Sequence, residues 1–148
     1  WEGASTQRDR EAGFMHVLNQ AGLSVHSRKV GDFKYSAAEQ AALDMFAADP
    51  PEAVFVANDH MALAVMDTLR FKMSIRVPED VSVVGYDDVA AASWPAYDLT
   101  TVRQPANRMV AETVDILLEK IDDPTAPARR IEIDGPLIER GSTRRVKG

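Results

Sequence analysis

The stretch from Val77 to Asp88 constrains the fold more than any other part of the chain. Within it, Val81–Val84 is a short β-branched run without helical periodicity, which is typical of a strand buried on both faces of a sheet. The run stops at Gly85, and Asp87 and Asp88 follow where the strand should end. In open α/β sheets, ligands bind beyond the carboxyl ends of the strands. The two adjacent carboxylates are therefore candidate ligand contacts.

Helices and strands alternate in the sequence before and after this stretch. Helices are predicted over residues 5–21, from 36 to a point before Pro50, and over 59–71, a helical turn over 90–94, and strands over 23–30, 53–57, 81–86 and 99–102. The second helix opens with Ser36 and Glu39 at capping-box spacing, and Asn58 can cap the third. This alternation predicts an α/β fold with a doubly wound, mostly parallel sheet. Because no strand precedes the first helix, we expect the chain to start inside a βα unit.

The pattern changes after residue 104. The spacing of apolar residues predicts a strong amphipathic helix over residues 107–121. Its apolar face consists of Val110, Val114, Leu117, Leu118 and Ile121. Residues 130–134 alternate polar and apolar, as an edge strand does, and a last short strand is predicted at Leu137–Ile138.

Composition excludes several classes of function. The chain has 148 residues, 45% of them hydrophobic, which suits one ordinary domain with a core. Its net charge is −6 and its basic end, with Arg144, Arg145 and Lys147, is short, so no nucleic-acid footprint is indicated. The absence of cysteine excludes disulfides, thiolate nucleophiles and Cys-ligated metals. No apolar run reaches membrane-spanning length.

In a parallel sheet, the successive strand ends would bring Phe33, Asn58 and Asp87 to one edge. An aromatic face, an amide and a carboxylate suit a polyol or sugar, because the ring can stack on C–H groups while the polar groups match hydroxyls. Two alternatives remain open. Asn58 can serve only as a helix cap, and Phe33 can serve only as a packing residue. Three such residues on successive strand ends favour a binding site.

An enzyme is the weaker hypothesis. The sequence has no GxSxG elbow, no P-loop and no GxGxxG motif. His60 beside the Asp87–Asp88 pair lacks metal-ligand spacing, so a solvated or capping histidine is favoured over a metal ligand. His16 and His26 are interpreted as ordinary surface or boundary residues. From the sequence alone, Arg10 belongs to a solvated helix face.

Several ordered pieces of the sequence resemble one family. They are Arg10-Glu11-Ala12-Gly13-Phe14, Ala57-Asn58-Asp59-His60-Met61-Ala62, Val77–Asp88, Leu99-Thr100-Thr101-Val102-Arg103-Gln104-Pro105 and Leu137-Ile138-Glu139-Arg140-Gly141-Ser142-Thr143. In this order and spacing they resemble the effector-binding domain of bacterial lactose-repressor (LacI/GalR) transcription regulators. The likeness covers nearly the whole chain.

This resemblance implies a fold like that of type I periplasmic binding proteins, with two Rossmann-like lobes, crossovers between them and a small molecule in the cleft. It implies effectors that are mostly sugars or their derivatives, with purines in some members, and no cofactor. By the resemblance, Arg10, Asn58 and Asp87 are polar effector contacts, Phe33 is the stacking aromatic, and Gln104 faces the cleft from a crossover strand.

The resemblance also divides the chain. Residues 1–104 correspond to most of the C-terminal lobe without its first strand, residues 105–134 to a helix and a strand of the N-terminal lobe, and residues 135–148 to the return and tail. The exposed apolar face of the helix would favour self-association.

The resemblance implies a cytoplasmic homodimer that meets DNA through a helix-turn-helix lying outside these residues. We expect the dimer surface to include Leu63 and Trp94, with the alternative that Trp94 plugs the core. A periplasmic sugar-binding protein of a transport system is the alternative function on the same fold.

Overall fold

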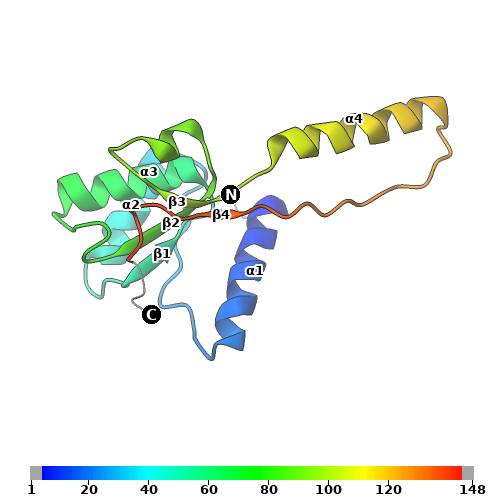
Figure 1. Ribbon diagram of the computed structural model, residues 1–148. Helices are drawn as coiled ribbons and strands as arrows, with labels where there is room; N and C mark the ends of the chain where they lie inside the picture. The colour runs from blue at the N-terminus through cyan, green and yellow to red at the C-terminus, as the bar shows by residue number, and fades with distance from the viewer. Residues whose placement is uncertain (1–4, 145–148) are drawn as a thin grey trace.

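A mixed sheet forms the centre of the molecule in the computed structural model, which describes residues 5–144 (Figure 1). The strands lie in the order β1 (Ala53–Phe55), β2 (Ser82–Asp87), β3 (Thr100–Arg103) and β4 (Leu137–Ile138). The first three strands are parallel, and β4 runs antiparallel to β3. The predicted α/β class with a mostly parallel sheet is confirmed.

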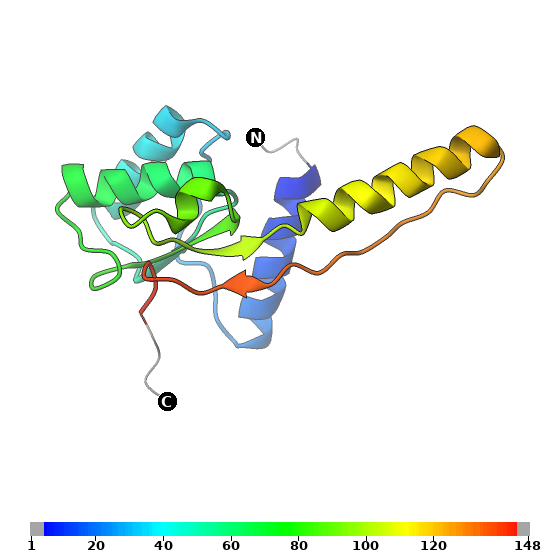
Figure 2. The same cartoon turned by 45° about the horizontal axis from the view of Figure 1, so that its top comes forward.

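Two helices, α2 (Tyr35–Phe46) and α3 (Asp59–Asp67), pack together on one face of this sheet (Figures 1 and 2). A π-helical segment, η1 (Thr68–Lys72), continues α3. The core between these helices and the sheet contains the fully buried side chains of Met66, Leu69, Val81, Val83 and Leu99. Burial of such apolar side chains is the main favourable contribution to folding, so this layer stabilises the strands that carry the site.

The first helix, α1 (Ser5–Gln20), contributes no buried residue to the core. It touches the sheet through Phe14, whose ring stacks on Phe55 with centroids 5.0 Å apart. Val17, on the same predicted apolar face, is 62% exposed. The helix is confirmed, but within residues 5–144 its apolar face is only partly covered.

The last helix, α4 (Ala106–Asp122), projects away from the sheet, and residues 123–136 return beside it to β4 (Figures 1 and 2). No residue of α4 is buried. Between β2 and β3, a 3₁₀ turn, η2 (Ala90–Ser93), ends at Trp94, which is 57% exposed. The predicted helix and turn are confirmed, and Trp94 does not plug the core.

Two predicted strands and one predicted cap are wrong. Residues 23–30 and 130–134 form no strand, because a strand forms only where its N–H and C=O groups meet a neighbouring strand, and residues 5–144 offer neither segment such a neighbour. Helix α2 starts at Tyr35, and its N-cap, Lys34, makes no side-chain cap. Ser36 therefore lies inside the first turn and does not open a capping box.

Candidate functional site

The carboxyl ends of β2 and β3 bring together three side chains that the resemblance assigns to effector binding. Arg10 Nη2 lies 3.0 Å from Asp87 Oδ1, and Gln104 Nε2 donates a hydrogen bond to the same oxygen. Asp87 is the last residue of β2 and pairs in register with Arg103, so Gln104 follows immediately on the neighbouring strand. The parallel sheet thus places an acceptor between two donors at its ligand-binding edge.

Arg10 is held in place by two further contacts. Its Nη1 donates to the carbonyl oxygen of Ala57 at 2.5 Å, just beyond the end of β1. Its guanidinium carbon lies 3.9 Å from the centre of the Tyr86 ring, a cation–π arrangement. Because only 14% of the side chain is exposed, Arg10 belongs to the strand-end cluster and not to a solvated helix face.

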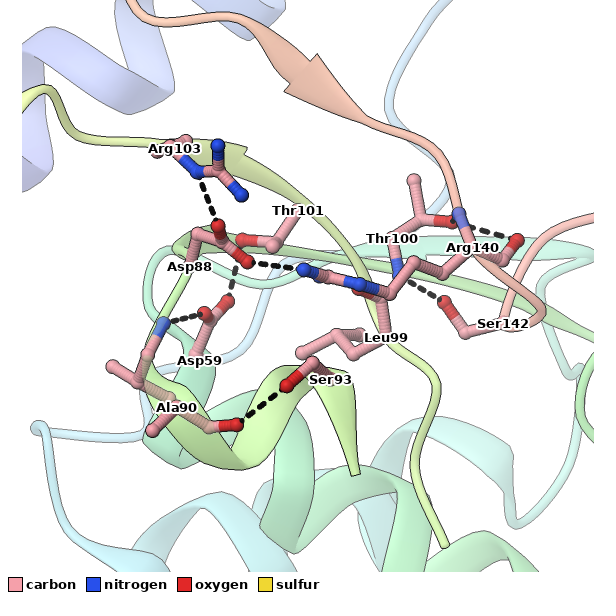
Figure 3. Close-up of polar contacts among 11 residues, drawn as sticks. Asp59, Asp88, Ala90, Ser93, Leu99, Thr100, Thr101, Arg103, Arg140 and Ser142 are labelled. Carbon is pink, nitrogen blue, oxygen red and sulfur yellow. Dashed lines mark hydrogen bonds and ion pairs between the residues drawn. The ribbon is translucent and has the colours of Figure 1, made fainter. Parts of the chain in front are cut away.

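The backbone that carries Asp87 is unusual. Asp87 and Asp88 have φ values of 123° and 56°, a region that costs non-glycine residues of the order of 1–3 kcal/mol. A buried carboxylate from the start of α3 holds the segment that follows. Asp59 is 0% exposed and accepts hydrogen bonds from Thr101 Oγ1 at 2.7 Å and Val89 N at 2.9 Å (Figure 3). Burial raises the pKa of Asp59, and these two hydrogen bonds oppose the rise.

Asp88 is engaged with two arginines and is not placed as a ligand contact. Its carboxylate oxygens lie 2.5 Å from Arg103 Nε and 2.7 Å from Arg140 Nη2, and its side chain is 6% exposed (Figure 3). Burial acts to raise the pKa of Asp88, but the hydrogen bonds from Arg103 and Arg140 outweigh it and the pKa is lowered. Of the two adjacent carboxylates, only Asp87 joins the cluster with Arg10.

Asn58 caps α3, as its alternative interpretation predicted. Its Oδ1 accepts a hydrogen bond from Met61 N at 2.9 Å, and its backbone is extended, as is usual at an N-cap. Only Oδ1 of Asn58 takes part in the cap, so the cap does not engage its Nδ2 donor. Because Asn58 follows Ala57, the carbonyl partner of Arg10, it lies beside the cluster.

Phe33 does not follow a strand, so that part of the prediction is wrong. The segment before it is unpaired, and Phe33 itself has a φ of 54° and is 37% exposed. None of the contacts described for residues 5–144 joins its ring to Arg10 or Asp87. The premise that three consecutive strand ends form the site therefore holds for Asn58 and Asp87 but not for Phe33.

Sequence reasoning missed the roles of Tyr86, Asp59 and Arg140. Arg140 lies 52 residues from Asp88, and Thr101 lies 42 residues from Asp59, so spacing carried no signal for either pairing. His60 is exposed, and residues 5–144 contain no group of three or more acidic or histidine side chains placed to hold a metal. In the same part of the chain, no helix is both long and apolar enough to cross a membrane.

A parallel sheet with charged and amide side chains gathered at its carboxyl edge defines a ligand-binding α/β domain. The chain belongs to the family of periplasmic binding protein-like domains, which it matches over residues 2–143. It is also similar to transcription regulators, and the resemblance to the LacI/GalR family is confirmed.

Two relatives and one solved structure illustrate this similarity. The HTH-type transcriptional repressor PurR of Photobacterium profundum is 36% identical over 95% of the chain, and the ribose operon repressor of Escherichia coli K12 is 33% identical over 91%. The structure of the transcriptional regulator CelR in complex with cellobiose superposes with a TM-score of 0.81 at 36% identity, covering 90% of this chain and 41% of that one. The chain spans 42% of the length of each of the two repressors.

Proposed function

We propose that this chain is the effector-sensing domain of a bacterial transcription repressor. On this proposal it binds a small sugar-like molecule and couples binding to operator recognition by a separate helix-turn-helix. The similarity to two repressors supports regulation over the alternative of solute transport. One similar protein is a ribose operon repressor and one similar structure is a regulator in complex with cellobiose, which supports a sugar-like effector. The proposal assigns the site no catalytic role.

The cluster of Arg10, Asp87 and Gln104 carries this proposal. The guanidinium and the amide are donors and the carboxylate is an acceptor, so together they match a hydroxyl group, which both donates and accepts. The Nδ2 donor of Asn58 adds a further polar group near this edge. We propose that Phe33 moves onto the sugar ring when effector binds, because its exposed aromatic side chain offers a stacking face.

Coupling requires two states with different effector affinities. We propose that residues 1–104 and 135–148 form one lobe and residues 105–134 form part of a second; residues 1–4 and 145–148 lie outside the described range. The projection of α4 away from the sheet supports this division (Figure 2). Effector held at the strand ends would then favour one arrangement of the lobes and so one spacing of the DNA-binding heads. We propose that the protein acts in the cytoplasm, as a DNA-bound regulator would.

We further propose that copies of the chain form a dimer through a surface that includes Leu63 and Trp94. Leu63, on α3, is partly buried, and Trp94 is 57% exposed. Exposed tryptophan is enriched at protein interfaces. Phe71, in the π-helical continuation of the helix that carries Leu63, is 81% exposed and adds a large exposed apolar side chain to this element.

The test is calorimetric titration of the full-length repressor with ribose and with cellobiose, in the wild type and in Asp87→Ala. We expect one of the sugars to bind the wild type. The variant should lose about 10- to 150-fold in affinity, because a charge-assisted hydrogen bond contributes roughly 1.5–3 kcal/mol.

Asp80→Ala is the matched control, because Asp80 is an exposed acid paired with Arg76 and lies away from the strand ends. It should bind like the wild type. Equal affinity in Asp87→Ala would remove Asp87 from the site. If neither sugar binds at millimolar concentration, the sugar-like effector is contradicted.

A further inference from the structure

Two aromatic side chains, Phe55 on β1 and Tyr86 on β2, lie on the sheet face opposite α2 and α3. Phe55 pairs in register with Val84, and Tyr86 is two residues further along β2. Because neighbouring residues of a strand point to opposite faces, Phe55, Val84 and Tyr86 share one face. Gly85 faces the other way, since a Cβ there would meet the Asp59 carboxylate at the start of α3. We call Phe55 and Tyr86 the aromatic pair.

Helix α1 meets the aromatic pair at two points. The Phe14 ring stacks on Phe55, with centroids 5.0 Å apart and an angle of 21° between the ring planes. One helical turn earlier, the Arg10 guanidinium carbon lies 3.9 Å from the centre of the Tyr86 ring. Residues four apart lie on the same face of a helix, so both contacts belong to one docking surface. Within it, Phe55 receives an apolar ring and Tyr86 receives a cation.

Hydrogen bonds and ion pairing alone leave the Arg10 guanidinium one degree of freedom. Its Nη1 donates to Ala57 O at 2.5 Å, and its Nη2 lies 3.0 Å from Asp87 Oδ1. These two contacts define an axis through the terminal nitrogens, and the planar group can still turn about that axis. A guanidinium over an aromatic ring is attracted to the ring face. The Tyr86 ring therefore fixes the angle that the other two contacts leave open.

This angle decides where the unused donors of Arg10 point. A guanidinium has five N–H groups in one rigid plane, and the contacts with Ala57 and Asp87 use one on each terminal nitrogen. The Nε–H and the second N–H of each terminal nitrogen remain for a ligand. If the plane turns about the axis, these groups turn with it and lose their alignment with a ligand bound at the strand ends.

The ring of Tyr86, rather than its hydroxyl, makes this contact. None of the hydrogen bonds described for residues 5–144 uses the Tyr86 hydroxyl. Phenylalanine offers the same ring face without the hydroxyl, and leucine offers apolar volume without a ring. Substitution of Tyr86 by each of these residues therefore separates the cation–π contact from simple packing.

We propose that Tyr86 is a positioning residue of the effector site. Its ring sets the angle of the Arg10 guanidinium and so directs the unused N–H groups at the effector. This role rests on the proposed function, in which Arg10 binds the effector. A donor group that is already oriented loses less conformational freedom on binding, so the ring raises affinity through Arg10.

The first test is the side-chain NMR signal of Arg10 in the present chain without ligand, assigned by its loss in Arg10→Lys. An aromatic ring shields protons above its face. The Nε–H of Arg10 should therefore resonate upfield of that of Arg130, whose side chain is 88% exposed. Tyr86→Phe should keep this upfield shift, and Tyr86→Leu should lose it.

The second test is the affinity of the full-length repressor for ribose and for cellobiose, measured by calorimetric titration. For the sugar that binds, Tyr86→Leu should weaken binding by about 5- to 30-fold, because a largely desolvated cation–π contact is lost. Tyr86→Phe should stay within about twofold of the wild type. Phe55→Leu is the matched control, because it removes the ring that receives Phe14 and leaves the ring that receives Arg10. It should keep the Arg10 signal shifted and weaken binding less than Tyr86→Leu does.

The proposal is overturned if the Arg10 signal is not shifted in the wild type, or if it stays shifted in Tyr86→Leu. It is also overturned if Tyr86→Leu binds as the wild type does, or if Phe55→Leu weakens binding equally, since looser docking of α1 would then be the cause. If Tyr86→Leu does not fold, a nuclear Overhauser effect between the Arg10 Nε–H and the Tyr86 ring in the wild type takes its place, and its absence contradicts the role of Tyr86. If neither sugar binds the wild type, the sugar-like effector is contradicted, and the Arg10 signal alone decides whether Tyr86 orients the guanidinium.

Discussion

Asp87 and Asp88 are neighbours in sequence, but their carboxylates have opposite surroundings. The Asp87 side chain, 22% exposed, meets Arg10 and Gln104 at the strand ends. The Asp88 side chain, 6% exposed, ties the end of β2 to Arg103 on β3 and to Arg140 beyond β4. One acid is therefore available to a ligand, while the other fixes the backbone from which the first projects.

Asp88→Asn is expected to lower the free energy of unfolding by about 2–3 kcal/mol at neutral pH, because two arginines lose a largely buried charge partner. The folded-state pKa of Asp88 lies below its ordinary value of 3.8. The stabilisation is therefore complete above that value and is lost as the pH falls through the lower, folded-state pKa. In urea unfolding, the difference between wild type and variant should shrink from about pH 5 to about pH 2.

Asp80→Asn serves as the control for this pH dependence. Asp80 also pairs with an arginine, Arg76, at 2.5 Å, and the hydrogen bonds from Arg76 lower the pKa of Asp80 to about 2. Its pair is open to solvent, which screens it, so the substitution should change stability little. An equal loss in both variants would contradict the structural role of Asp88.

At the scale of elements, the sequence predicted helices better than strands. Helices 5–21 and 107–121 were recognisable because helical hydrogen bonds are local and the apolar residues recur at helical spacing, although neither helix buries a residue among those described. The strands predicted over 23–30 and 130–134 have the right composition, but pairing depends on a neighbour that is distant in sequence.

Contacts between residues distant in sequence also limited the prediction of the candidate site. Strand-end logic found Asn58 and Asp87 from the residues themselves, whereas Arg10 and Gln104 came only from the family resemblance. The predicted strand-end position of Phe33 is wrong because the strand predicted over residues 23–30 does not form. From the sequence, Asp88 is only a candidate ligand contact, because nothing there indicates that Arg140, 52 residues away, binds it.

Gly85 shows how closely β2 approaches α3. A Cβ at this position would collide with Asp59 Oδ1 and lie 3.0 Å from Leu99 Cδ2. Both neighbours are fully buried. Gly85→Ala is therefore expected to lower the free energy of unfolding by about 1–3 kcal/mol, measured by urea unfolding at neutral pH.

Gly13→Ala is the matched change in the middle of α1, where an added Cβ would meet nothing within 4 Å. Alanine favours a helix over glycine by about 0.5–1 kcal/mol, so this variant should be slightly more stable than the wild type. If Gly85→Ala and Gly13→Ala change the free energy of unfolding in the same direction, the close contact with Asp59 is not the reason that residue 85 must be glycine.

On the scale of the whole molecule, two exposed apolar surfaces compete to join copies of the chain. One is the α4 face, where Val110, Val114, Leu117, Leu118 and Ile121 are between 46% and 73% exposed. The other is the proposed dimer surface, where Trp94 is 57% exposed, together with Phe71, which is 81% exposed. Contiguous apolar patches of this kind mark contact surfaces in soluble proteins. The two belong to different elements, because α4 projects from the body (Figure 1), whereas Phe71 lies in η1 and Trp94 follows η2.

Sedimentation velocity separates the two surfaces. Trp94→Ala is expected to convert dimers to smaller species, because it removes the large exposed side chain at the proposed dimer surface. Leu117→Lys should instead remove only species larger than the dimer, because a charge in the middle of the α4 face opposes its burial. Asp115→Asn, which changes the net charge by the same amount on an exposed position of α4, should leave the distribution unchanged. If Leu117→Lys abolishes the dimer and Trp94→Ala does not, α4 is the dimer surface. The proposal that the dimer forms through Leu63 and Trp94 is then contradicted.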